Sequence, residues 1–243
     1  MSRIIMMTLS LLVLIILHVI ATFFSLNGQT TSEIANRLPL LFIPANYVFL
    51  LWIVIYAMLF VWIPSFAKEQ KFINLRMYGF FTAIALSIVW IFCWHYGYLS
   101  LSIAAKILLL CILFSVYFSY HKTDNRISGR MPYSLLIGWN FLTLISTVSY
   151  YLLLHDWSGF GLSAPLWTVI YLTISTAFAL HFMFHYHDFM MNFVFIWTFI
   201  GIAFKNGTDE LFVTAAALFL TAVLIAFMIF RENHSKKRAV LSK

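Results

Sequence analysis

The chain has 243 residues, of which 63% are hydrophobic and only 9% are charged. A water-soluble surface cannot be built from this composition, so an integral membrane protein is expected. The formal net charge of +7 comes from basic residues scattered over several segments instead of one stripe, which argues against a nucleic-acid-binding protein.

Apolar runs long enough to cross a hydrocarbon core of about 30 Å predict an all-α bundle of about eight transmembrane helices. The predicted spans are Ile4–Phe24, Pro44–Ile63, Arg76–Tyr96, Leu101–Tyr120, Pro132–Leu153, Ala164–Phe184, Phe189–Phe204 and Asp209–Phe230. The first run lacks a small-x-small cleavage site and is interpreted as a retained anchor. The seventh is the weakest, because it is short and follows its predecessor after only the polar letters HYHD.

The placement of Lys and Arg predicts that both termini are cytoplasmic, because cytoplasmic flanks of membrane helices collect basic residues. With the N-terminus inside, only Arg37, Lys106 and Lys205 fall outside the inner segments. The tail 231–243 is then a basic cytoplasmic segment that contacts anionic lipid. The expected location is the plasma membrane.

The first outer segment, residues 25–41, is long enough to fold over the bundle as a lid, although an ordinary solvated connector is equally compatible with it. It carries a turn signal at Asn27-Gly28 and a helix-start signal at Thr31-Ser32-Glu33. The two cysteines, Cys93 and Cys111, lie inside predicted helices, where they are expected to be packing residues.

The second predicted helix carries aromatic residues at membrane depth. Pro44 suits the first turn of a helix, which would place Trp52 about 12 Å and Tyr56 about 18 Å from the helix start. Hydrocarbon offers no partner to an indole N–H or a phenol O–H. Phe49, Trp52 and Tyr56 share one helical face, which should therefore look toward other helices or toward a ligand.

The third and fifth predicted helices repeat this pattern with Ser87 and Trp90, and with Trp139, Asn140 and Thr143. Polar side chains at membrane depth avoid lipid and are expected to hydrogen-bond across helices. The combined faces suit a flat, mostly apolar ligand held by stacking and a few hydrogen bonds. Plain packing between helices is the alternative. The candidate ligand-binding residues are Phe49, Trp52, Tyr56, Ser87, Trp90, Trp139, Asn140 and Thr143.

These features resemble the tryptophan-rich sensory protein family, also called the translocator protein or peripheral benzodiazepine receptor family. The resemblance is carried by Pro44, Trp52, Tyr56, Trp90 and the pair Pro132-Tyr133. It covers residues 1–153 and implies a five-helix bundle with a pocket near the outer face that binds porphyrins and other flat hydrophobic molecules. Residues 154–230 would add three helices, as in longer bacterial relatives.

The chain departs from the family pattern at three positions. Ala45 stands where a second proline is usual, Ser87 where an asparagine is usual, and Leu136 where a tryptophan is usual. The predicted pocket is therefore reshaped. No cofactor is assigned, and a porphyrin or haem-like molecule is the candidate ligand.

Isolated ionisable residues have competing interpretations. His18, in the first helix, is a conceivable haem ligand, but a neutral histidine bonded to a neighbouring helix is the more common case. His181, His185, His187 and Asp188 have metal-ligand spacing, although a solvated inner turn is favoured. Lys106 is expected to extend toward the outer interface.

No nucleotide-binding loop, intramembrane carboxylate pair, metalloprotease motif or nucleophile elbow is found, so a non-enzymatic protein is expected. The expected function is a receptor or sensor for a flat hydrophobic molecule. A non-catalytic scaffold or a small-molecule transport accessory is the alternative. The expected partners are the lipid bilayer and this small molecule, and a homodimer is left open.

Overall fold

The computed structural model describes residues 2–65 and 73–241. These residues are predominantly helical and contain no strand, and they form eight helices long and apolar enough to cross a membrane. The predicted all-α architecture is therefore confirmed, including the short seventh span. The helices are α1 (Ser2–Phe23), α3 (Leu51–Ser65), α4 (Ile73–His95), α5 (Leu99–Phe118), α6 (Met131–Leu154), α7 (Ala164–Tyr186), α8 (Phe189–Asn206) and α9 (Leu211–Leu241).

Local sequence signals define several helix starts. The Ser163 hydroxyl accepts the Leu166 N–H at the start of α7, and the Asp188 carboxylate accepts the Met191 N–H at the start of α8. Pro132 lies in the first turn of α6, where its missing N–H leaves no helical bond unmade. The second span differs from the prediction. It begins as the 3-10 helix η2 (Asn46–Leu50), and Pro44 precedes it instead of lying in its first turn.

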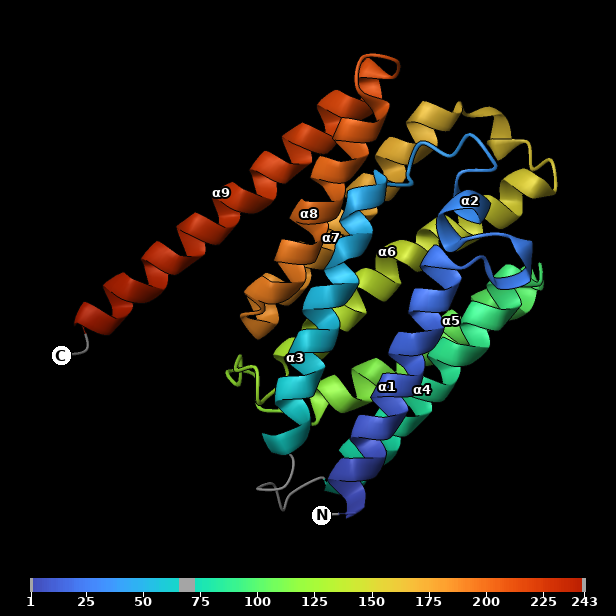
Figure 1. Cartoon of the computed structure of the whole chain (residues 1–243). Helices are drawn as coiled ribbons and strands as arrows, with labels where there is room; N and C mark the ends of the chain where they lie inside the picture. Colours follow the sequence, from blue (N-terminus) through green and yellow to red (C-terminus); the bar gives the residue numbers. More distant parts are fainter. Residues whose placement is uncertain (1, 66–72, 242–243) are drawn as a thin grey trace.

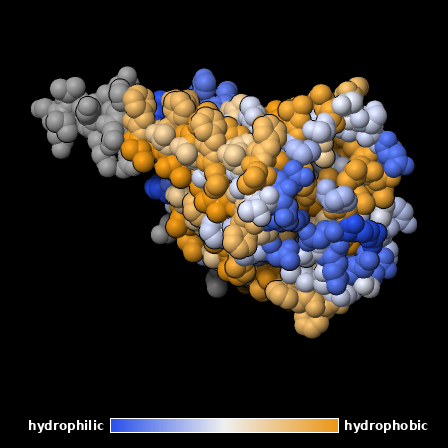
Figure 2. All heavy atoms as spheres, turned by 90° about the horizontal axis from the view of Figure 1, so that it is seen from above, coloured by the Kyte–Doolittle hydropathy of each residue, from blue (hydrophilic) through white to orange (hydrophobic). Residues whose placement is uncertain are grey.

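The chain crosses the bundle eight times, so both termini run toward the same end, the lower one in Figure 1. We call the other end, over which the α2 segment lies, the capped end. The helix α6 packs against α3, α5 and α8, and α9 packs against α7 and α8. Viewed onto the capped end, Figure 2 shows hydrophilic residues gathered in a patch and hydrophobic residues over much of the remaining surface.

The C-terminal helices pack directly on the first five. The Ala45 N–H donates to the Gly201 carbonyl of α8 at 3.1 Å. A Cβ added at Gly201 would lie 2.2 Å from Val48 Cγ2, so only glycine permits this approach of α8 to η2. The predicted division of the chain at residue 153 is not tested by this packing and stays a prediction.

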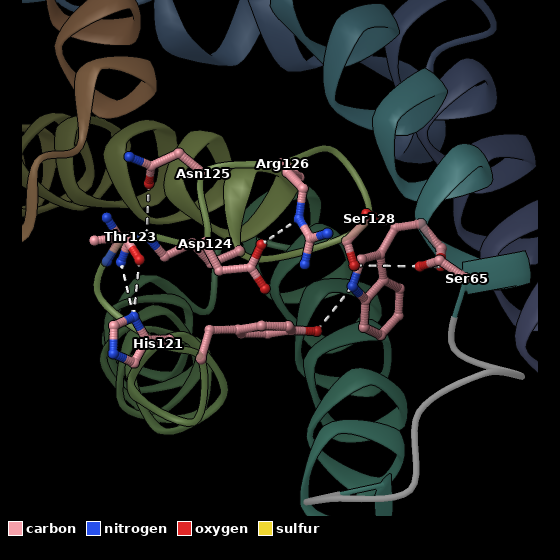
Figure 3. Close-up of polar contacts among 10 residues, drawn as sticks. Ser65, His121, Thr123, Asp124, Asn125, Arg126 and Ser128 are labelled. Carbon is pink, nitrogen blue, oxygen red and sulfur yellow. Dashed lines mark hydrogen bonds and ion pairs between the residues drawn. The ribbon is translucent and has the colours of Figure 1, made fainter. Parts of the chain in front are cut away.

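The end opposite the cap is tied together by the segment between α5 and α6 (Figure 3). The Ser65 hydroxyl at the end of α3 donates to the Ser128 carbonyl at 3.2 Å. Within the segment, Arg126 pairs with Asp124 at 2.8 Å. Lys68 and Lys71, which count among the basic residues of the predicted inner segments, lie outside the described residues.

A buried polar network joins this segment to the turn between α7 and α8. Asp188, which is 1% exposed, accepts hydrogen bonds from the hydroxyls of Tyr117 at 2.8 Å and Ser134 at 2.5 Å. Arg130 is equally buried and donates to the Tyr186 carbonyl. Three helices, α5, α6 and α8, thus share one carboxylate at this end.

Candidate functional site

The segment between α1 and η2 folds over the bundle and contains the short helices η1 (Leu26–Gly28) and α2 (Thr31–Ala35). A capping box formed by Thr30 and Glu33 defines the start of α2. Glu33 Oε2 accepts the Thr30 N–H at 2.7 Å, and the Thr30 hydroxyl accepts the Glu33 N–H at 3.2 Å. The Thr30 N–H and hydroxyl, which bond to the carboxylate, lower the pKa of Glu33 below its ordinary value of 4.5.

Apolar and polar contacts hold this cap in place. Ile34 and Ala35 are buried in a small cluster that includes Trp94 and Tyr150. The Asn27 amide donates to the His95 carbonyl at 3.0 Å. The segment is therefore packed onto α4 and α6, as the lid interpretation requires.

Beneath the cap lies an inner cavity of about 50 Å³. The cap segment, η2, α4, α6 and α8 all contribute to its wall. The lining residues are Thr31, Ala35, Phe42, Ile43, Pro44, Phe49, Trp90, Trp94, Trp139, Leu142, Thr143, Ser146, Thr147 and Thr198. Its wall is thus aromatic on the α4 side and rich in hydroxyls along α6.

The predicted binding residues divide into two groups in the structure. Phe49, Trp90, Trp139 and Thr143 line the inner cavity. The second group is outside the lining and consists of Trp52, Tyr56, Ser87 and Asn140. Residues of η2, α4 and α6 therefore meet at the cavity, whereas α3 itself contributes no residue to its wall.

Trp52 and Tyr56 form a cluster with His18 of α1. The Trp52 and Tyr56 rings are stacked with centroids 5.3 Å apart, and the His18 ring lies 4.4 Å from that of Trp52. The Tyr56 hydroxyl is hydrogen-bonded to His18 Nδ1, whereas His18 Nε2 has no partner among the described residues. This cluster joins α1 to α3, and Trp52 also meets the edge of Trp139 at 6.0 Å. The interpretation of His18 as a neutral histidine bonded to a neighbouring helix fits this contact.

The polar side chains of the marked faces were expected to bond across helices, but most of them bond within their own helix. The Ser87 hydroxyl donates to the Ala83 carbonyl at 2.8 Å, and the Asn140 amide donates to the Leu136 carbonyl at 2.9 Å. The carbonyl four residues earlier is always within reach of a short polar side chain, so no second helix is needed to satisfy it. The expectation was therefore wrong for these residues.

Lys106 also departs from its prediction. Instead of reaching the interface, its side chain is only 1% exposed. Its Nζ donates to Thr143 Oγ1 at 2.8 Å and lies 4.0 Å from the centre of the Trp90 ring. Its position seven residues into α5 places it roughly 10 Å below the helix start, deeper than the predicted span from Leu101 implied. Sequence reasoning left out of the site, among others, Trp94 and Thr198, which line the cavity, and Lys106, which contacts two of the lining residues.

A second, outer cavity of about 240 Å³ lies between the cap segment, the end of α6 and the start of α7. Its wall includes the aromatic residues Trp157, Trp167 and Tyr171. Phe42 lines both cavities and meets the Tyr171 ring edge-on at 5.7 Å. Phe42 is therefore common to the walls of the inner and outer cavities.

The histidine cluster at the opposite end does not assemble a metal site. The exposed rings of His181 and His185 stack 4.4 Å apart, and His187 lies beside Arg231. Desolvation and the positive charges of Arg231 and Arg130 lower the pKa of His187. Among the described residues, no group of three or more His, Cys, Asp or Glu side chains could hold a metal ion.

A membrane bundle whose first loop caps an aromatic cavity is the arrangement implied by the resemblance noted above. A family model described as TSPO-like protein matches residues 4–230. The chain belongs to the TSPO-like protein family. No curated protein and no solved structure matches it.

The match to the TSPO-like family extends into α9 as far as residue 230, so it includes α7, α8 and the first part of α9. The TSPO-like chain is a multi-pass membrane protein, and its family is generally non-enzymatic. In this chain, α8 supplies Thr198 to the cavity wall and carries the glycine against which η2 packs. The helices beyond residue 153 thus take part in the candidate site.

Proposed function

We propose that this TSPO-like protein is a membrane receptor or sensor that binds a flat hydrophobic molecule in the capped cavity without transforming it. A porphyrin or related tetrapyrrole is the first candidate ligand. The observation that carries the proposal is the group of aromatic rings on the cavity wall, Phe49, Trp90, Trp94 and Trp139, drawn from three separate elements. Aromatic faces and a few polar groups are the usual lining of a small-molecule site.

The size of the cavity sets a condition on this function. Its volume of about 50 Å³ is far below the roughly 300–1,000 Å³ of typical small-molecule pockets. A tetrapyrrole therefore requires the cap to shift, or Phe42 to rotate so that the inner cavity joins the outer one of about 240 Å³. Binding should accordingly be slow relative to diffusion, because it is coupled to opening.

The same small volume favours the alternative function, a non-catalytic scaffold or transport accessory whose aromatic faces only pack. Trp52 and Tyr56 support this alternative. They stack on each other and contact His18, to which Tyr56 is hydrogen-bonded, and neither residue lines the cavity. The two functions differ in whether any flat ligand binds saturably.

The proposed setting is the plasma membrane with both termini cytoplasmic, which places the capped end outside. The charge distribution of the sequence supports this orientation. A homodimer stays a prediction.

A titration with protoporphyrin IX, followed by tryptophan emission in lipid nanodiscs, tests the proposed function. We expect saturable quenching, and we expect Trp90→Leu to weaken binding by about 1–3 kcal/mol, by analogy with the loss of one aromatic stacking partner. Trp197→Leu is the matched control, because Trp197 is half-buried on α8 and lines neither cavity. Unsaturable quenching that is equal in all three proteins would support the scaffold instead.

A further inference from the structure

Lys106 is a fully buried lysine in the membrane-spanning part of the bundle. Its exposure is 1%, and no salt bridge to a described acidic residue accompanies it. Its ammonium group contacts the hydroxyl of Thr143 and the face of the Trp90 ring. A buried ammonium is costly unless a negative charge compensates it, so the lysine is a functional candidate by default.

The ammonium group of Lys106 contacts the wall of the inner cavity from behind. Both residues that it contacts, Trp90 and Thr143, line that cavity. Lysine has a flexible stem and three N–H donors, of which one is used by Thr143 Oγ1 at 2.8 Å. Lys106 therefore shares two contact residues with the cavity, and its flexible stem can carry the ammonium group toward an occupant.

Two residues of the cavity wall carry donors that lack partners. The indole N–H groups of Trp90 and Trp94 are buried, and neither has a hydrogen-bond partner in the part of the chain that the structure describes. An indole N–H can only donate. The hydroxyl protons of Thr143 and Thr147, by contrast, are already given to the carbonyls of Trp139 and of Thr143 itself. An acceptor-rich group is thus the natural occupant.

We propose that the inner cavity binds the carboxylate of a flat apolar ligand, with Lys106 as its counter-cation and the Trp90 and Trp94 indoles as hydrogen-bond donors. This inference rests on the proposed function and names the ligand class more closely. A volume of about 50 Å³ suits a carboxyl group and not the whole ligand, so the apolar body lies past Phe42 in the outer cavity. The carboxylate is the group that determines orientation.

Two matched probes test this inference without requiring a tetrapyrrole. The probes are 1-pyrenebutyric acid and its methyl ester, which share the flat ring system and differ in charge. Because they partition differently into lipid, the measured quantity is the ratio of affinities between wild type and variant for each probe in nanodiscs. Lys106→Met removes the charge and keeps an unbranched side chain of similar length.

We expect Lys106→Met to weaken binding of the acid by about ten- to a hundredfold, the usual value of a hydrogen bond to a charged group, and to leave the ester unchanged. Lys122→Met is the control, since Lys122 is exposed outside the membrane-spanning helices. The melting temperature of Lys106→Met should equal or exceed that of wild type, because an uncompensated buried charge is removed.

A second variant, Trp94→Phe, keeps the ring and removes the indole donor, and it should lower the affinity for the acid several-fold. This variant keeps the inference testable if Lys106→Met does not fold. Equal loss, or no loss, for the acid and the ester would overturn the inference and leave the proposed function standing. Saturable binding of neither probe, together with none of protoporphyrin IX, would overturn both.

Discussion

The bond between Tyr56 and His18 leads to a prediction that separates packing from ligand binding. Tyr56→Phe removes only the hydroxyl that meets His18 Nδ1, and it leaves the stacking on Trp52 in place. Both partners of this bond are at least nine-tenths buried, with exposures of 8% for Tyr56 and 7% for His18. Water therefore cannot replace the lost hydroxyl.

The expected cost follows from this burial. Hydrogen bonds between membrane helices average about 0.6 kcal/mol and reach about 1.7. His18 Nε2 has no partner among the described residues, so the variant leaves the His18 ring without a side-chain hydrogen bond, although the ring still contacts that of Trp52. An unsatisfied buried group adds to the loss, and we expect about 1–2 kcal/mol of destabilisation. Binding of protoporphyrin IX should not change, because neither residue lines the inner or the outer cavity.

Reversible unfolding in mixed detergent micelles, followed by circular dichroism, measures this cost. A double-mutant cycle with His18→Leu should return a coupling energy of about 1 kcal/mol. Tyr78→Phe is the control, since Tyr78 is 64% exposed on α4 and its change should lie within about 0.5 kcal/mol of zero. Unchanged stability of Tyr56→Phe with weakened porphyrin binding would refute the reasoning and place the hydroxyl at the ligand.

Two further predictions concern how α8 and the cap support the site. Gly201→Ala should destabilise the protein, because the new Cβ would lie 2.2 Å from Val48 Cγ2. The overpacking costs about 1–3 kcal/mol, offset by about 1 kcal/mol of helix propensity, and Val48→Ala in the same chain should restore stability in thermal melts. Thr30→Ala should cost about 1 kcal/mol of local cap stability, seen as faster hydrogen exchange of cap amides with an unchanged global melt. Because the pKa of Glu33 is lowered in the folded chain, the contribution of Glu33 to cap stability is present above its unfolded pKa and is lost as the pH falls through the folded value. Equal hydrogen exchange in wild type and Thr30→Ala near neutral pH would contradict the capping box.

The sequence by itself determined the eight membrane crossings and most of their bounds. Crossing a bilayer requires only length and apolarity, which are local properties of each segment. The second span shows the limit of such signals. Pro44 is compatible with a first helical turn, yet the helix begins at Asn46 because the chain around Pro44 packs against Gly201 of α8. That contact joins residues far apart in the chain.

The tertiary structure alone decided which members of the marked faces reach the cavity. Helical spacing puts Phe49, Trp52 and Tyr56 on one face. Only Phe49 lines the inner cavity, because Trp52 and Tyr56 contact His18 of α1 instead. Lys106 was assigned to the interface because its depth in α5 is compatible with a stem extended to water. Its burial depends on Trp90 and Thr143, which two other helices bring beside it. Helical periodicity fixes the direction of a side chain on its own helix, whereas its partner depends on how the helices are arranged around one another.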